Sequence, residues 1–261
     1  MTNTTKIALV TGASRGLGKN TAFALAKKGI GVIVTYRSSE TEANSVVSEI
    51  EAMGSKAVAL QLDTSNTKTF DSFLGQVKQS LQDKWQTGQI DFLVNNAGIG
   101  IYAPFAETTE EEFDRLMNIH VKGVFFLTQK LLPLLKDGGR IVNISSGLAR
   151  FALPGYAAYG AMKGAIEVLT RYMAKELGHR QIAVTVAAPG AIATDFAGGS
   201  VRDNSEINNF LASQTALGRV GVPDDIGGAL AKLTEGIASL LSEDNRWVNA
   251  QRLEVSGGMF L

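Results

Sequence analysis

The fold of this chain follows from one stretch, Ile7-Ala8-Leu9-Val10-Thr11-Gly12-Ala13-Ser14-Arg15-Gly16-Leu17-Gly18. A short apolar run ends in a glycine-rich turn, and the turn leads directly into a segment with helical periodicity. Glycines at such a turn let the backbone bend tightly and approach a pyrophosphate at the N-terminus of the helix. The stretch therefore predicts a strand, a turn and a helix that together could bind a dinucleotide.

Two other interpretations of the glycine turn fail on spacing. A kinase-type phosphate loop has four residues between its first glycine and a Gly-Lys pair, but five residues separate Gly12 from Gly18 and Asn20 follows the lysine. The strict G-x-G-x-x-G pattern does not fit either, because Thr21 stands three residues beyond Gly18. A tight turn without a ligand stays an alternative, since glycine is common wherever a strand turns into a helix.

Short apolar runs alternate with longer amphipathic segments along the rest of the chain. This alternation predicts parallel strands joined by right-handed helical crossovers. We therefore expect one α/β domain over residues 1–261, with a doubly wound, seven-stranded parallel sheet and helices on both faces. A less regular segment at about 195–215 is predicted to form a flap over the substrate. The predicted strands are 7–10, 31–35, 57–61, 90–94, 140–144, 182–187 and 252–255.

Composition excludes several classes of partner. Lys plus Arg and Asp plus Glu number 25 each, so no overall positive field attracts nucleic acid or an anionic membrane. The absence of cysteine excludes disulfides and thiolate chemistry, and two isolated histidines argue against a metal site. The polar stretch 1–6 lacks the apolar core of a secretory signal, and no apolar run reaches the length of about 18 residues that spans a bilayer. We expect a cytoplasmic protein with a small-molecule partner.

The end of the second predicted strand indicates which dinucleotide is bound. An acid at this place, about 20 residues past the glycines, would bind the ribose diol of NAD. Arg37 stands there instead, and together with Arg15 it could clamp a 2′-phosphate, with Ser38 adding a hydroxyl. The pattern favours NADP(H). The alternative is that both arginines are ordinary solvated surface residues.

Tyr159 and Lys163 lie four residues apart at the predicted start of a long helix, so both side chains lie on one helix face. A tyrosine has an ordinary pKa of about 10, and a nearby ammonium lowers that pKa toward the working range of an acid-base catalyst. The pair therefore predicts a proton donor. Because this spacing is common, a surface pair on a helix stays the alternative.

Further motifs follow the predicted strands in an ordered series. Asn95-Asn96-Ala97-Gly98 follows the fourth strand, Ser145-Ser146 the fifth and Pro189-Gly190 the sixth, and all should meet at the edge where a doubly wound sheet binds its ligand. With the glycine turn and the Tyr159–Lys163 pair, this series resembles the compact form of the short-chain dehydrogenase/reductase family from Lys6 to Leu261. A non-catalytic dinucleotide-sensing protein on the same fold stays an alternative.

The resemblance implies where the cofactor would lie. The glycines would shape the pyrophosphate turn, and Asp63 and Thr64 would face the adenine. Asn95, Ala97 and Gly98 would line the ribose, and the segment after the sixth strand would hold the nicotinamide. The implied cofactor residues are Gly12, Ser14, Arg15, Gly16, Leu17, Gly18, Arg37, Ser38, Asp63, Thr64, Asn95, Ala97, Gly98, Tyr159, Lys163, Pro189, Gly190, Ile192 and Thr194.

The resemblance also implies reversible reduction of a ketone with NADPH. Tyr159 would protonate the carbonyl oxygen, Ser146 would hold that oxygen, and Lys163 would tune the tyrosine, while Ser145 would face the other way. A 3-oxoacyl-carrier-protein reductase stays an alternative, and so does an epimerase or dehydratase of the longer family branch.

One departure from the family concerns a proton relay. The family carries an asparagine in the helix before the catalytic serine, where His120 aligns and Asn118 falls two residues early. We expect His120 to serve in the relay, because its ordinary pKa of about 6.5 suits proton transfer. A space-filling histidine is the alternative.

The expected substrate pocket is largely apolar. Arg150 is a nearby cation that could read an anionic substrate, although a solvated role is favoured. Apolar helix faces around Phe125 and Val168 predict a homotetramer or homodimer. The expected substrate contacts are Ser146, Leu148, Leu153, Tyr156 and Phe196, with Ala149, Ile101 and Tyr102 as further candidate walls.

Overall fold

The computed structural model describes residues 5–227 and 236–261, and residues 1–4 of the polar N-terminal stretch lie outside the described residues. Seven parallel strands form one sheet in the order β3-β2-β1-β4-β5-β6-β7, which confirms the predicted sheet. The strand order changes direction between β1 and β4, which creates the crevice where such sheets bind ligands. The strands are β1 Ile7–Val10, β2 Gly31–Tyr36, β3 Ala57–Gln61, β4 Ile90–Asn95, β5 Leu135–Ile144, β6 Ala183–Pro189 and β7 Arg252–Val255.

Three strand bounds agree with the sequence prediction and four differ. The largest difference is β5, which begins at Leu135 and not at Arg140. Its first half contains Gly138 with a positive φ, and the pairing with β4 shifts register between Ile90 and Phe92. Leu135 pairs with Ile90 and Arg140 pairs with Phe92, so the polar residues between Leu135 and Arg140 bulge out of the pairing.

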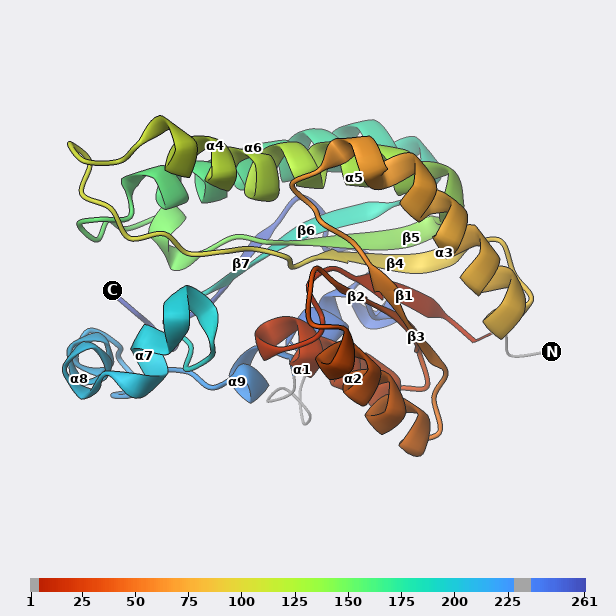
Figure 1. Ribbon diagram of the computed structural model, residues 1–261, viewed down its shortest axis with the longest axis horizontal. Coiled ribbons are helices and arrows are strands. Elements are labelled where there is room, and N and C mark those ends of the chain that lie inside the picture. Colours follow the sequence, from red (N-terminus) through yellow and green to blue (C-terminus); the bar gives the residue numbers. More distant parts are fainter. Residues whose placement is uncertain (1–4, 228–235) are drawn as a thin grey trace.

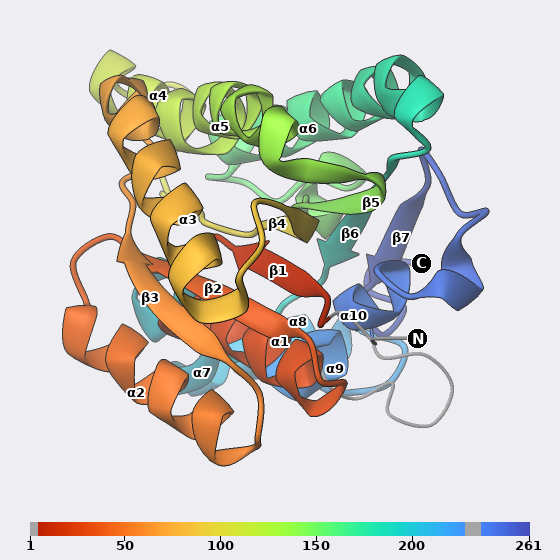
Figure 2. The ribbon, with the colours of Figure 1, turned by 90° about the vertical axis from the view of Figure 1, so that its right-hand side faces the viewer.

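Two helical layers cover the sheet (Figures 1 and 2). Along β1, the side chains of Ala8 and Val10 pack toward one layer, while those of Ile7 and Leu9 pack toward the other. Burial on both faces explains why the strands are apolar without alternation. The first layer holds α1 Gly16–Lys27, α2 Glu40–Ala52, α9 Pro223–Gly227 and α10 Gly236–Leu240, and the second holds α3 Phe70–Trp85, α5 Gly123–Leu131 and α6 Ala157–Glu176.

The connection after β4 contains an unusual helical turn. Helix α4, Glu110–Met117, begins with a capping box between Thr109 and Glu112. It continues into a π-helical turn, Asn118–Lys122, and then into α5. Turns of this kind widen the backbone locally and are often found at functional sites.

The segment predicted as a flap forms two short helices after β6. Helices α7, Ser200–Asp203, and α8, Ser205–Ser213, lie together at one end of the molecule (Figure 1). The Asn204 side chain accepts hydrogen bonds from the Glu206 and Ile207 amides, which explains why α8 begins there. Within residues 5–227 and 236–261, no helix combines the length and apolar character needed to cross a membrane.

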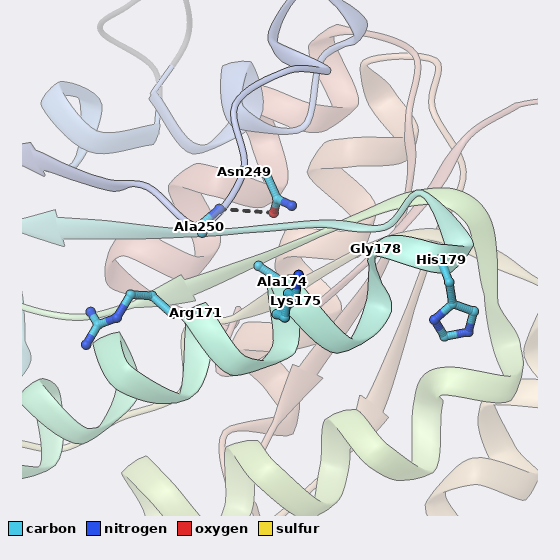
Figure 3. Close-up of a pocket in the computed structure, with 7 residues that line it drawn as sticks. All are labelled: Arg171, Ala174, Lys175, Gly178, His179, Asn249 and Ala250. Carbon is cyan, nitrogen blue, oxygen red and sulfur yellow. Dashed lines mark hydrogen bonds between the residues drawn. The ribbon is translucent and has the colours of Figure 1, made fainter.

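A hollow lies at the amino end of β6, where the turn before β7 faces the C-terminal half of α6 (Figure 3). Asn249 closes this turn, because its Oδ1 accepts hydrogen bonds from the Val184 amide at 2.9 Å and from the Ala250 amide at 3.0 Å. Ala250 adopts a left-handed conformation with φ of 58°. Arg171 and Lys175 of the hollow lie far along α6 from Tyr159, and His179 lies beyond its end, so the hollow is not part of the predicted site.

Candidate active site

The carboxyl ends of β1 and β4 bring the glycine turn against the motif after β4. A Cβ added to Gly12, where φ is 62°, would lie 3.0 Å from the Ala97 Cα. The Thr11 hydroxyl accepts hydrogen bonds from the backbone amides of Asn96 and Ala97, both at 2.9 Å. Two segments far apart in sequence therefore form one wall of a crevice.

Asn96 holds the glycine turn from the side. Its Nδ2 donates to the carbonyls of Thr11 at 2.8 Å and Gly12 at 3.1 Å. A Cβ added to Gly18 would lie 2.3 Å from the Gly12 oxygen and 2.6 Å from this nitrogen, so only glycine fits. Thr11 and Asn96 were not among the residues expected at the cofactor. Two adjacent asparagines after a strand were the available signal, because neighbouring side chains point to opposite faces.

We expected Asn95 to line the cofactor ribose, but its side chain points elsewhere. Asn95 is buried, and its Nδ2 donates to Thr128 of α5 at 3.0 Å and to Asn143 of β5 at 2.8 Å. Asn143 in turn donates to Thr170 of α6 at 2.8 Å. The Asn95 side chain therefore ties β4 to the second helical layer and points away from the glycine turn.

The residues expected at the adenosine end lie at the ends of β2 and β3. Arg37 and Ser38 are exposed, and the Arg37 Nε lies 3.9 Å from the Asp63 carboxylate. Asp63 also accepts hydrogen bonds from the amide and hydroxyl of Ser65 at 2.9 and 2.7 Å. Thr64 lies beside them, with its carbonyl against Gly123. A shallow concavity next to this region is lined by Ser14, Arg15, Gly16, Lys19, Thr41, Glu42, Ser45 and Asp195.

The segment after β6 closes the crevice from the other side. Gly190 donates its amide to the Val255 carbonyl at 3.1 Å and packs against Ser256, while Pro189 ends the strand. Ile192 pairs with Gly221, and Thr194 is the nearest residue to Gly16, at 3.9 Å from an added Cβ. Thr194 therefore lies opposite the glycine turn. Leu17 packs into the core below the turn.

Ser146, Tyr159 and Lys163 meet inside this crevice. The Ser146 and Tyr159 side chains share a hydrogen bond, and the Ser146 Oγ also accepts from the Leu148 amide at 3.2 Å. The Lys163 Nζ donates to the Ile144 carbonyl at 2.8 Å and lies 5.5 Å from the centre of the Tyr159 ring. Ser145 faces the other way, as predicted, and donates to Glu167 at 2.8 Å.

Burial dominates the proton affinities of the two central groups. It raises the pKa of the Tyr159 phenol above its ordinary value, and the hydrogen bond with Ser146 acts in the opposite direction. Burial lowers the pKa of the Lys163 ammonium to about 7. We expected a charged lysine to favour the phenolate, but in this structure desolvation outweighs that effect and the phenol keeps its proton.

His120 lies on the π-helical turn and is buried against Gly98. Its Nε2 lies 2.8 Å from the Ile99 carbonyl, and its Nδ1 is buried without a hydrogen-bond partner. Burial lowers the pKa of His120 to about 3, and the positive charge of Lys163 acts in the same direction. The expectation of a pKa near 6.5 is therefore wrong, and the ring is neutral at physiological pH.

Several aromatic rings lie close to the Tyr159 ring. Phe196 of the flap lies 5.8 Å from the Tyr159 ring centre and contacts Gly100. Tyr156 lies 6.5 Å from Tyr159 on the other side, and Tyr102 meets Tyr156 edge-on at 5.6 Å. Ile101 and Leu148 pack in the same cluster, Leu153 contributes a carbonyl that accepts from the Tyr156 amide, and Ala149 ends the turn after Ser146.

Arg150 lies at the surface, as the sequence favoured, and its guanidinium is paired there. Its Nε and Nη2 both donate to Glu254 at 2.8 Å, and further hydrogen bonds reach the carbonyls of Met259 at 2.8 Å and Phe260 at 3.2 Å. A guanidinium held by one carboxylate and two carbonyls has little capacity left to read an anionic substrate.

Comparison with known proteins agrees with this geometry. Residues 12–260 match the family model described as enoyl-(acyl carrier protein) reductase. The chain is 37% identical to the hydroxynaphthalene reductase-like protein Arp2 of Metarhizium brunneum, over 97% of this chain and 94% of that protein. The crystal structure of the angucycline C-6 ketoreductase LanV with bound NADP has a TM-score of 0.90 at 35% identity, covering 99% and 97% of the two chains. Another structure of LanV holds NADP and rabelomycin. A short-chain dehydrogenase/reductase from Serratia marcescens BCRC 10948 has a TM-score of 0.87 at 30% identity and 98% coverage of both chains.

Proposed function

This chain belongs to the short-chain dehydrogenase/reductase family, and we propose that it reduces a ketone to a secondary alcohol with NADPH. The observation that carries the proposal is the meeting of Tyr159, Ser146 and Lys163 in a crevice opposite the glycine turn. A non-catalytic binding protein would not need a buried phenol and ammonium beside each other, because burying such groups is costly.

The residues present fit a dinucleotide. The close packing of Gly12 on Ala97 and of Gly18 on the Gly12 oxygen leaves a backbone surface that a Cβ would fill, as a pyrophosphate site requires. The turn residues Ser14–Gly18 would hold the pyrophosphate, and Arg15, Arg37 and Ser38 a 2′-phosphate. When bound, NADPH supplies a hydride. Asp63 and Thr64 would face the adenine, the backbone of Asn95 with Ala97 and Gly98 the ribose, and Pro189, Gly190, Ile192 and Thr194 the nicotinamide.

The three catalytic side chains have different tasks. The Tyr159 hydroxyl, which burial keeps protonated, donates its proton to the carbonyl oxygen as negative charge develops there. The Ser146 hydroxyl donates a hydrogen bond to the same oxygen and so stabilises that charge. Lys163, which donates to the Ile144 carbonyl, would hold the nicotinamide ribose and return a proton toward Tyr159.

His120 serves the proton relay in its neutral form. Its buried and unpartnered Nδ1 is an acceptor that could hold a water on the path to Lys163, while Nε2 is fixed by Ile99. The His120→Ala variant should lower turnover and change its pH profile. His120→Asn, which also offers an acceptor, should lose less. A His120→Ala enzyme with unchanged turnover and pH profile would leave a purely space-filling role.

The substrate is an aromatic ketone. The rings of Tyr102, Tyr156 and Phe196 support this class, because flat apolar rings stack on one another. The relatives support it as well, since hydroxynaphthalene is itself a pair of fused aromatic rings. Leu148 and Leu153 would complete the pocket, with Ser146 holding the carbonyl.

Absorbance of reduced nicotinamide tests the function. The purified chain is mixed with NADPH or NADH and with 2-tetralone, a fused-ring ketone, or an acetoacetyl thioester. Fastest loss of absorbance with NADPH and 2-tetralone is expected, and Tyr159→Phe should lower the rate by about 10²–10⁴-fold. Preference for the thioester would instead identify a 3-oxoacyl reductase. No reaction, with NADPH still bound, would identify a binding protein.

A second copy of this chain covers the outer faces of α5 and α6. Phe125, Phe126, Val168 and Tyr172 are all at least 40% exposed there, and exposed apolar side chains gathered on neighbouring helices are typical of an interface. A homotetramer or homodimer should appear in light scattering, and Val168→Glu should dissociate it. A monomeric wild type would overturn the proposed assembly.

Cytoplasmic location stays a proposal, to be tested by cell fractionation.

A further inference from the structure

A network of two arginines and two glutamates lies behind the Ser146 turn and takes no part in the chemistry proposed above. Arg252, the first residue of β7, uses all three nitrogens of its guanidinium. Its Nε donates to Glu167 at 2.6 Å, its Nη1 to Glu254 at 2.7 Å and its Nη2 to the Ser146 carbonyl at 3.3 Å.

The same network reaches the helix that carries Tyr159 and Lys163. Glu167 stands one turn after Lys163 on α6 and accepts a hydrogen bond from Ser145, the neighbour of Ser146. The Ser145 hydroxyl also lies 3.2 Å from the Lys163 carbonyl. Arg252 therefore connects the backbone of the serine turn with the backbone of the helix that presents the phenol.

Glu254 and Arg150 form the other half of the network and are also hydrogen-bonded. Glu254 lies between Arg252 and Arg150 and accepts a further hydrogen bond from Ser256 at 2.9 Å. These contacts lower the pKa of Glu254 to about 2, so its charge is present throughout the physiological range. The guanidinium of Arg252 is thus held in one orientation by two carboxylates, and its third arm can only point at Ser146.

We propose that Arg252 is a positioning residue that acts through the Ser146 carbonyl to aim the Ser146 hydroxyl at the carbonyl oxygen of the substrate. The assignment of a catalytic role to Ser146 rests on the proposed function, but the structural effect does not. Ser146 has an extended backbone at the start of a tight turn, where its carbonyl otherwise accepts, among the described residues, only the Ala149 amide at 3.1 Å. Small displacements of such a group reduce the rate strongly because the reacting geometry is narrow.

Arg180 provides a matched control. Its Nε donates to Asp137 at 2.7 Å, and its other nitrogens donate to the carbonyls of Leu132 and Leu135 at 3.0 and 2.5 Å. Its side chain is 25% exposed and that of Arg252 is 23% exposed. Arg180 lies at the other end of α6, so Arg180→Met removes the same kind of contacts without touching the serine turn.

The test compares Arg252→Met, Arg252→Lys and Arg180→Met with the wild type. Arg252→Met should lower kcat for 2-tetralone reduction by about tenfold, with KM and the Kd for NADPH within about twofold. Arg252→Lys keeps the charge and should recover part of the loss, and Arg180→Met should leave kcat unchanged. Unchanged kcat in Arg252→Met, or equal losses in kcat and NADPH affinity, would overturn the proposal.

Amide hydrogen exchange tests the positioning without any turnover. The amides of Leu148 and Ala149 bond to the hydroxyl and carbonyl of Ser146. Arg252→Met should speed their exchange by about tenfold, because these bonds open with the loosened turn, whereas Arg180→Met should not. Equal exchange in all variants would overturn the inference. Absence of turnover in the wild type, with faster exchange in Arg252→Met, would overturn only the proposed function.

Discussion

The imidazole of His120 meets the ring of Tyr159 edge-on, with the ring centres 5.4 Å apart and the planes at 89°. A charged ring so close to Lys163 would disfavour the ammonium, and the low pKa of His120 avoids this repulsion. The contact therefore places a neutral polar group against the proposed proton donor.

The free energy of unfolding at acidic pH should show that the His120 imidazole is buried without a charge. The pKa of His120 is about 3 in the folded chain against an ordinary value of 6.5, so between these pH values only the unfolded chain binds the proton. The contribution of His120 to stability is complete above pH 6.5 and is lost as pH falls toward 3. Unfolding by urea at pH 7, 6 and 5 should show a free energy that falls by up to about 1.4 kcal/mol per pH unit more steeply in the wild type than in His120→Asn. Parallel pH dependences would contradict the burial of an uncharged ring.

The buried Lys163 should lower the free energy of unfolding at pH 7, although turnover requires it. The pKa of Lys163 is about 7 in the folded chain and ordinarily 10.5, so the unfolded chain holds the extra proton between these values. The wild type should therefore gain stability as pH rises from 7 to 10.5, and Lys163→Met should lack this gain. At pH 7 the variant should be at least as stable as the wild type and nearly inactive. Thermal unfolding at pH 7, 8 and 9, with a parallel ketone assay, checks both; a variant less stable at pH 7 would contradict the cost of burial.

Arg37 should separate the two nicotinamide cofactors. Its exposed guanidinium at the end of β2 is free to meet a 2′-phosphate, with the Asp63 carboxylate only 3.9 Å away as a weak partner. Arg37→Ala should raise the Kd for NADPH by about tenfold or more and leave the Kd for NADH within about twofold. Fluorescence titration with both cofactors measures this, and NADH serves as the internal control. Equal weakening of both would show that Arg37 does not recognise the phosphate.

Replacing Ala250 with glycine should stabilise the folded chain. Its φ of 58° is strained for a residue with a Cβ, and the turn is closed by Asn249 (Figure 3). Ala250→Gly should raise the free energy of unfolding by about 1 kcal/mol, because glycine adopts this conformation freely. Ala24→Gly, inside α1, should lower it by at least about 1 kcal/mol. Loss of stability in Ala250→Gly would show that the strain is outweighed by the greater freedom of the unfolded chain.

The sequence predicted the sheet because burial on both faces leaves a continuous apolar run in each strand. Strands β1, β3 and β7 begin and end where predicted. The first half of β5 was missed because Lys136-Asp137-Gly138-Gly139 is polar and forms a bulge, and only the pairing of Leu135 with Ile90 extends the strand to this point. The partner of the exposed Arg150 could not be predicted for a related reason: Glu254, which binds it, lies 104 residues later in the chain.

The fold, the glycine turn and the shared helix face of Tyr159 and Lys163 follow from the residue pattern, since local spacing and the 3.6-residue helical period set these. Tertiary structure alone decided that Asn96 and not Asn95 holds the glycine turn, that His120 is neutral, and that Arg252 reaches Ser146. These properties depend on which distant segments bury and contact a side chain. Desolvation and long-range ion pairs act through space, so no local pattern of residues contains them.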